Sequence, residues 1–327
     1  FQAEDGIRDC LLSRGLGDVY KRQLKGLPQI TENSVAFNLE ADSLNASILG
    51  KQATPGTAEY DLFIKECVKE ITIKAGQKCT AVRRIIVPEN LIDEVETSIA
   101  QRLGKTTIGD PAQEGVRMGA LATKTQVDRV RENVDLLAKS QKIVFGDLDG
   151  FELMGADKKL GAFFPPVLFR NNDPFKKTDC HDIEAFGPVS TIMPYKEIED
   201  AVELAKMGKG SLVSSIVTPD DKEAREYVVG AASMHGRILV LNKDCAKEST
   251  GHGSPMPLLT HGGPGRAGGG EEMGGKRGVL HYLQRTAIQG HPTTITEITQ
   301  QFQIGAETPE ANPHVFRKHF EELVVGE

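Results

Sequence analysis

Hydrophobic residues follow two different spacings along this chain. Over residues 57–73 they recur every three or four positions, which indicates one face of an amphipathic helix that Gly76 can end. Over residues 80–87 β-branched and apolar residues follow one another until Pro88, which is typical of a buried strand. The same criteria predict further helices at 91–103, 125–137, 198–207 and 220–232, and further strands at 34–39, 189–194, 211–218 and 237–241. Asn90 and either Asp220 or Asp221 are placed to cap two of these helices.

The elements alternate between helix and strand, which predicts an α/β fold with a mostly parallel sheet and flanking helices. The pattern changes after residue 242. Residues 251–278 are rich in glycine and poor in apolar side chains, and a loop of this length within a domain is usually functional. Residues 280–288 are predicted to form a short helix or strand, and residues 291–327 a linker with one weakly amphipathic stretch at 316–325.

The first residues, 1–23, do not fit this organisation. They begin without methionine and have neither the apolar core of a signal peptide nor a helical period. The string resembles translated sequencing adapter, so we expect it to be non-native and exclude it, with Cys10, from the fold; the alternative is a genuine polar lead-in. On the first hypothesis the natural protein begins further upstream and this chain is a fragment.

The composition is that of a globular protein, with 39% hydrophobic and 26% charged residues. The formal net charge of −7 argues against nucleic acid or an anionic membrane surface as a partner, and no apolar run approaches the ~20 residues that cross a bilayer. The five cysteines are too few and too scattered for a disulfide framework, so we expect free thiols and a cytoplasmic protein. The tetrad 179–182 (DCHD) is a weak metal candidate because no second His or Cys cluster accompanies it, and we expect no metal site.

Two glycine patterns carry little weight. Residues 263–268 match GxGxxG but do not follow a strand and open a βαβ unit. Residues 270–276 match GxxxxGK, but Arg277 stands where a phosphate-binding loop needs Ser or Thr. We interpret both as chance matches.

Two residues are candidates for covalent and acid–base chemistry. Cys79 follows Gly76-Gln77-Lys78 between the predicted helix and the predicted strand, a turn that gives a thiolate access and a fixed direction, and four cations stand near it in sequence (Lys74, Lys78, Arg83, Arg84). Glu40 follows the strand predicted at 34–39, where a carboxylate can act as a general base if burial raises its pKa. Taken singly, Cys79 is more often a small core residue and Glu40 at least as often a solvated acid.

Together, and with further motifs in the same order, these residues resemble the aldehyde dehydrogenase family. In that family a Glu in an E-L-G-G-like motif precedes a G-Q-x-C motif that holds the nucleophile; here Glu40 and Cys79 stand in that order, 79 − 40 = 39 positions apart. Further stretches at 108–111, 118–121, 163–167, 184–189 and 262–274 resemble family motifs. The colinear match covers roughly residues 28–290.

The resemblance implies the fold of an aldehyde dehydrogenase catalytic domain and a role for each matched residue. Cys79 would be the nucleophile, with its main-chain N–H donating to the developing oxyanion, and Glu40 the general base that activates water. Glu184 would hold hydroxyls of the nicotinamide ribose, and Phe186 would bound the nicotinamide. The cofactor is expected to be NADP or NAD, with NADP favoured.

Some stretches depart from the general family pattern. Ala41-Asp42-Ser43 replaces the glycines after the catalytic Glu, and the runs 246–255 and 261–270 are not general to the family. Together they resemble the aldehyde dehydrogenase half of bifunctional phenylacetate-degradation proteins of the PaaZ type. This implies a CoA-linked semialdehyde as substrate, a homo-oligomer, and a hydratase domain that is absent here. A stand-alone relative acting on another CoA-linked semialdehyde is an alternative.

The same resemblance suggests a domain division. Residues 24–43 would end a dinucleotide-binding domain, most of which is missing; residues 44–275 would form the catalytic domain, 276–290 an oligomerisation segment, and 291–327 the linker toward the hydratase. Two other functions stay open: an acylating enzyme in which CoA takes the thioester, which Glu40 speaks against, and an inactive assembly module.

Overall fold

The computed structural model describes residues 23–34, 37–38, 40–256, 259, 261–268, 275–281 and 283–307. It divides into two compact units, Phe1–His281 and Tyr282–Glu327, each of which is described by itself. The second unit holds the helix α11 (Pro292–Thr299). The segments expected at 1–23 and 316–325 lie outside the described residues, except for Gln23, which is in a helical turn.

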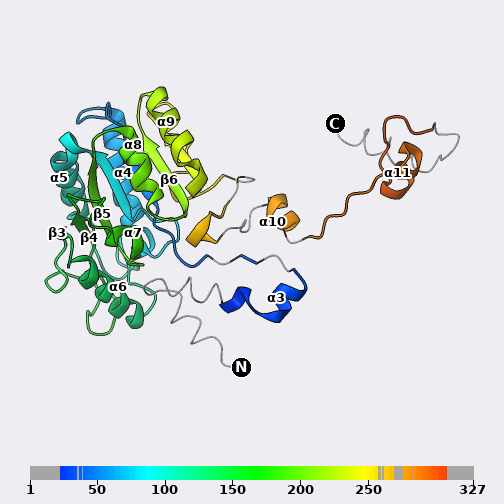
Figure 1. Cartoon of the computed structure of the whole chain (residues 1–327). Helices are drawn as coiled ribbons and strands as arrows, with labels where there is room; N and C mark the ends of the chain where they lie inside the picture. The colour runs from blue at the N-terminus through cyan, green and yellow to red at the C-terminus, as the bar shows by residue number, and fades with distance from the viewer. Residues whose placement is uncertain are drawn as a thin grey trace. The chain divides into compact units, whose positions relative to one another are not determined.

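A seven-stranded sheet forms the centre of the first unit, in the order β3-β4-β5-β2-β1-β6-β7 (Figure 1). All neighbouring strands are parallel except the edge pair β3–β4, which is antiparallel. The predicted α/β fold with a mostly parallel sheet is confirmed. The strands are β1 (Ala46–Leu49), β2 (Arg84–Pro88), β3 (Lys142–Phe145), β4 (Val167–Arg170), β5 (Val189–Tyr195), β6 (Ser211–Val217) and β7 (His235–Leu241).

Helices cover both faces of the sheet (Figure 1). Successive residues of a strand point to opposite faces, so Ile85 lies in the core formed with α4 (Ala58–Thr72) and α5 (Ile92–Leu103), whereas Ile86 lies in the opposite core. The opposite core includes residues of α6 (Lys124–Leu137), α8 (Ile198–Lys206) and α9 (Asp221–Ala231). Because both faces are covered, every residue of β2 and β6 is buried, including Arg84 in β2 and the three serines of β6.

Shorter elements complete the described part of the first unit. They are α3 (Pro28–Glu32), α7 (Asp179–Asp182) and α10 (Gly275–His281), with the 3₁₀ turns η1 (Ile73–Gly76), η2 (Glu89–Leu91), η3 (Ala232–Met234) and η4 (Gly265–Ala267). The glycine-rich stretch 251–278 therefore contains η4 and the start of α10. Among the described residues of 280–288, where a helix or strand was expected, only the first two are helical: α10 ends at His281, and residues 283–288 have no regular structure.

The predicted helix caps are partly confirmed. The Asp220 side chain accepts hydrogen bonds from the main-chain N–H groups of Lys222 and Glu223 at the start of α9. The prediction for Asn90 is wrong: Asn90 lies within η2, so α5 begins one residue later than predicted, with Leu91 at the cap position and no side-chain cap.

The central strand β1 was not predicted from the sequence. It has only four residues, all buried, which is too short to show either spacing, and polar residues precede it. The strand predicted at 34–39 is wrong for its described residues: Ser34 adopts a φ of 48° in a turn, and Phe37 and Asn38 have no regular structure. Residues 35, 36 and 39 lie outside the described part.

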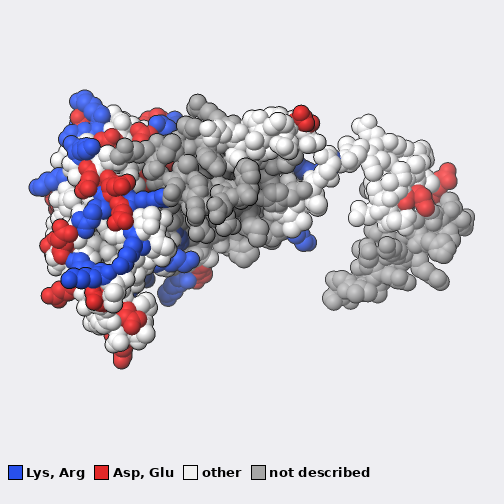
Figure 2. Space-filling view, turned by 90° about the horizontal axis from the view of Figure 1, so that it is seen from below, with Lys and Arg blue, Asp and Glu red and all other residues white. Residues whose placement is uncertain are grey.

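Charges of both signs are spread over the face of the first unit seen in Figure 2. Within the described residues, no helix combines the length and the apolar character needed to cross a membrane.

Candidate active site

A cavity of about 1210 Å³ contains all four residues that the sequence singled out: Glu40, Cys79, Glu184 and Phe186. They come from three segments, each of which leads directly into one of the strands β1, β2 and β5. These three strands are neighbours and parallel, so their amino ends meet at one edge of the sheet. The topology therefore brings together side chains that lie far apart in the sequence.

The segment before Cys79 is a sharp turn built from left-handed residues. Lys74 and Ala75 each have a φ of 52°, and Gly76 has a φ of 69°. A Cβ atom at Gly76 would lie 2.1 Å from the carbonyl oxygen of Gly187, so only glycine fits there. The turn thus presses the Cys79 loop against the loop that carries Glu184 and Phe186.

Cys79 is a half-buried free thiol whose main chain is hydrogen-bonded to a buried side chain. Its carbonyl oxygen accepts a hydrogen bond from Nδ2 of Asn45 over 2.8 Å, and the same Nδ2 donates to the carbonyl of Ala81 over 2.9 Å. Within the described residues the main-chain N–H of Cys79 donates to no protein group. That N–H can therefore bind an oxygen of a ligand.

Asn45 was missed by the sequence analysis. It is fully buried, and its Oδ1 accepts hydrogen bonds from Oγ of Ser43 over 2.7 Å and from the main-chain N–H of Val213 over 3.1 Å. It joins the start of β1 to the Cys79 loop. The one available signal was a polar residue next to a short apolar run, which does not distinguish a buried amide from a loop residue.

Glu184 is a nearly buried carboxylate with a side chain that is 6% exposed. Burial raises its pKa to about 7; Arg83 opposes the shift, and Asp42 adds to it. The main-chain N–H of Ser43 donates to its Oε2 over 3.3 Å. A carboxylate in this setting changes its charge near neutral pH.

Arg83 connects the Cys79 loop to the Glu184 loop. Its guanidinium donates to the carbonyl oxygens of Gly76 (2.8 Å) and Gly187 (2.7 Å), and lies 5.3 Å from the centre of the Phe186 ring. Burial lowers its pKa, against the opposing charges of Glu184 and, more weakly, Cys79. Arg83 is thus a cation whose charge interacts with Glu184 and, more weakly, with Cys79.

The other cations near Cys79 in sequence have different surroundings. Lys78 pairs with the buried carboxylate of Glu70 over 2.9 Å. Lys74 lines the cavity. Arg84 is fully buried and donates to main-chain carbonyls, those of Leu44, Leu204 and Ala205. Proximity to Cys79 in sequence therefore did not show what each of these cations contacts.

Glu40 lies on a segment held by the glycine-rich stretch. The main-chain N–H of Ala41 donates to the carbonyl of Arg266 over 3.2 Å, and the guanidinium of Arg266 pairs with the carboxylate of Asp42. A Cβ atom at Gly268 would lie 3.3 Å from the main-chain nitrogen of Glu40. Residues 263–268, which match GxGxxG, therefore pack against the segment that carries Glu40.

In the weak metal candidate at 179–182, both ring nitrogens of the histidine lie next to protein groups. His181 is buried, with Nδ1 at 3.0 Å from Arg84 and Nε2 at 3.1 Å from the carbonyl of Pro174. Across the part of the chain that the structure describes, no group of three or more His, Cys, Asp or Glu is arranged to hold a metal ion.

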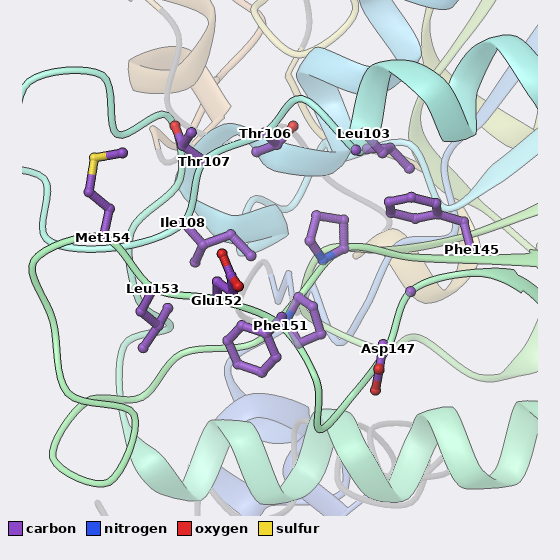
Figure 3. Close-up of a pocket in the computed structure, with 14 residues that line it drawn as sticks. Leu103, Thr106, Thr107, Ile108, Phe145, Asp147, Phe151, Glu152, Leu153 and Met154 are labelled. Carbon is purple, nitrogen blue, oxygen red and sulfur yellow. The ribbon is translucent and has the colours of Figure 1, made fainter.

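A second cavity of about 490 Å³ lies elsewhere in the first unit (Figure 3). It is lined largely by apolar side chains, among them Leu103, Ile108, Phe145, Phe151 and Met154, and holds none of the four predicted residues. The larger cavity is therefore the candidate active site.

Comparison with known proteins identifies the same family that the sequence motifs resemble. Residues 29–288 match the aldehyde dehydrogenase family. The chain is 41% identical over 262 residues to the 3,4-dehydroadipyl-CoA semialdehyde dehydrogenase of Aromatoleum evansii, which covers 80% of this chain and 51% of that protein. It is 50% identical over 212 residues to protein MaoC of Klebsiella aerogenes, which covers 64% of this chain and 61% of that protein. The chain thus spans less than two thirds of the length of each of these relatives.

The fold is shared with a solved structure of betaine aldehyde dehydrogenase from Staphylococcus aureus, a double mutant in complex with NAD⁺. The TM-score is 0.68 at 21% sequence identity, over 82% of this chain and 49% of that one. The matched residues 29–288 include the Glu40, Cys79 and Glu184 motifs and most of the chain. The chain therefore belongs to the aldehyde dehydrogenase family.

Proposed function

We propose that the protein oxidises an aldehyde to a carboxylate with NAD⁺ or NADP⁺ as hydride acceptor, using Cys79 as nucleophile and Glu40 as general base. One observation carries this proposal: a single cavity collects a half-buried thiol, the carboxylates of Glu40 and Glu184, and an aromatic ring from three separate segments. A thiol and a carboxylate that reach the same bound substrate are what thioester formation and hydrolysis require.

The first half of the reaction uses the thiol. The Cys79 thiolate forms a bond to the carbonyl carbon, and the carbonyl oxygen becomes an oxyanion. The main-chain N–H of Cys79, which has no partner within the described residues, is placed to donate to that oxyanion. When the oxyanion collapses, two electrons leave the carbon as hydride and a thioester remains on Cys79.

The second half of the reaction uses the carboxylate. Glu40 takes a proton from a water molecule, which attacks the thioester carbonyl. The bond between carbon and sulfur then breaks, so that the acid leaves and the Cys79 thiolate is restored. Covalent catalysis of this kind divides one difficult oxidation into two easier steps.

The residues of the cavity fit a nicotinamide nucleotide. Arg83 and Ser43 each donate to one oxygen of Glu184, and each carboxylate oxygen has a further lone pair that can accept from ribose hydroxyls. Phe186 lines the same cavity and offers a flat apolar wall. When bound, the nicotinamide supplies the hydride acceptor. NADP rather than NAD is the expected form, by resemblance to the PaaZ type.

A CoA-linked semialdehyde is the proposed substrate. The support is the 41% identity to an enzyme named for 3,4-dehydroadipyl-CoA semialdehyde. Glu40 in the cavity favours hydrolysis of the thioester over its transfer to free CoA. In the acylating alternative, turnover would instead depend on added CoA.

The test compares variants of the protein. Cys79→Ala is expected to abolish formation of reduced nicotinamide, whereas Cys245→Ala, at another half-buried free thiol, should leave it unchanged. Glu40→Gln should still produce reduced nicotinamide in the first turnover and then turn over slowly, because the thioester persists. Undiminished aldehyde oxidation by Cys79→Ala would overturn the proposal, and an inert wild-type protein would favour the assembly module.

A further inference from the structure

The glycine-rich stretch contains one arginine whose contacts reach two segments of the candidate active site. Arg266 is 13% exposed and its guanidinium engages both carboxylate oxygens of Asp42, whose side chain is 19% exposed. The same guanidinium donates to the carbonyl of His181 over 3.1 Å and to the carbonyl of Asp182 over 2.9 Å. Its donors are thus shared between the segment that carries Glu40 and the segment that leads to Glu184.

The main chain of Arg266 is hydrogen-bonded as well as its side chain. Its carbonyl accepts from the N–H of Ala41, and its own N–H donates to the carbonyl of Lys209 over 3.2 Å, just before β6. Arg266 lies in η4, between Gly265 with a φ of 59° and Gly268 with a φ of 114°. Arg266 therefore binds both residues that follow Glu40: its main-chain carbonyl binds Ala41, and its side chain binds Asp42.

We propose that Arg266, through its ion pair with Asp42, is a positioning residue that aims the Glu40 carboxylate at the thioester on Cys79. The inference rests on the proposed function and adds a specific device to it.

Physical chemistry makes this pair suited to positioning. A guanidinium that donates two parallel hydrogen bonds to a carboxylate fixes orientation as well as distance. Both side chains are mostly buried, so water competes little for their hydrogen bonds. Since Ala41 and Asp42 are the next residues after Glu40, loss of the pair frees the segment that carries the general base. A displacement of about 1 Å can cost about 100-fold in rate.

The test separates the two halves of the reaction in the intact protein. Arg266→Lys keeps the charge but loses the paired hydrogen bonds; Asp42→Asn keeps the shape but loses the charge. For both variants, the first-turnover rate of nicotinamide reduction should stay within a factor of about 3 of wild type, while steady-state turnover falls about 10- to 100-fold. The matched control is Arg170→Lys, another partly buried arginine that pairs with Asp93 and Glu96 at the opposite end of the sheet strands.

Two further measurements distinguish positioning from folding. Arg266→Ala should regain steady-state turnover when guanidinium ion is added, because the ion can occupy the vacated space beside Asp42. The double variant Asp42→Asn with Arg266→Lys should be no slower than the worse single variant, because both changes break one interaction.

Each possible result either supports the positioning role of Arg266 or overturns it. Unchanged steady-state turnover in Arg266→Lys, or an equal fall in both rates without guanidinium rescue, overturns the positioning role. If the Cys79→Ala variant still reduces nicotinamide, the proposed function itself fails, whatever Arg266 does. The first-turnover rate therefore reports on Cys79, and its ratio to steady-state turnover reports on Arg266.

Discussion

Nε of Arg83 lies 3.3 Å from Oε1 of Glu184, and the two side chains are 3% and 6% exposed. This ion pair joins the loop that carries the candidate nucleophile to the loop proposed to hold the nucleotide. Water is nearly excluded from the guanidinium and the carboxylate, so their opposite charges interact strongly. The pKa of Glu184 therefore depends on the positive charge of Arg83.

Nucleotide affinity should depend on pH through Glu184. Ribose hydroxyls bind better to the ionised carboxylate, so the dissociation constant for NAD(P)⁺ should fall as pH rises through about 7 and level off above it. The charges of Asp42 and Arg266 also interact with the Glu184 carboxyl, so both residues are kept unchanged in this experiment. Isothermal titration across pH 5.5–8.5 measures the effect, with Glu184→Gln as the variant that should lose it.

Arg83 should determine the pH at which nucleotide affinity changes. Arg83→Met removes the cation that opposes the rise in the pKa of Glu184, so the pH dependence should move to higher pH, whereas Arg83→Lys should move it less. A transition in Arg83→Met at the same pH as in wild type would contradict the pairing.

Gly76 should tolerate no side chain. In Gly76→Ala the new Cβ would lie 2.1 Å from the carbonyl oxygen of Gly187, in addition to the strain of a positive φ, and we expect a loss of at least about 3 kcal/mol together with aldehyde oxidation. Gly56→Ala is the matched control: its φ is +92°, but nothing lies within 4 Å, so it should cost only about 1–2 kcal/mol and leave activity intact. Urea unfolding compares the two, and equal losses would argue against the close contact.

Asn45 should be important for the Cys79 loop. Asn45→Ala leaves the carbonyls of Cys79 and Ala81 without their donor, and we expect about 2–4 kcal/mol of destabilisation. Asn33→Ala removes an exposed hydrogen bond to Gln29 and should cost under about 0.5 kcal/mol. Urea unfolding measures both, and the rate of alkylation of Cys79 should change only in the first variant.

Three buried histidines should make the protein sensitive to acid. Burial lowers the pKa of His181 and His252 to about 3 and that of His235 to about 4. The unfolded chain takes up these protons from about pH 6.5 downward while the folded protein does not, so stability is complete above that pH and is lost as pH falls toward 3. Each histidine should cost about 2 kcal/mol between pH 7 and pH 5.

Urea titrations at several pH values test this expectation. His252→Asn should flatten the dependence of the unfolding free energy on pH by the share of one histidine. A slope that is the same in this variant as in wild type would show that His252 is protonated in the folded protein as readily as in the unfolded chain.

Much of the fold was predictable because long elements carry their own periodicity. The helix at 57–73 and the strand at 211–218 were found nearly at their observed bounds, since each is long enough to show a pattern. Four-residue strands such as β1 show none, yet β1 lies between β2 and β6. Its place is decided by neighbours far away in sequence, whose main-chain groups it needs for hydrogen bonding.

By itself, the sequence determined the α/β class, the family and the identity of the four candidate residues, because motif order and hydrophobic spacing are properties of the chain. The tertiary structure alone decided which charges act on them. Of the four cations near Cys79 in sequence, Lys78 pairs with Glu70, Arg84 bonds main-chain carbonyls, Lys74 lines the cavity and Arg83 meets Glu184. Asn45 and Arg266, which hold the segments of Cys79 and Glu40, were likewise visible only in three dimensions. Hydrogen bonds and ion pairs act over a few ångströms, and folding, rather than sequence separation, sets those distances.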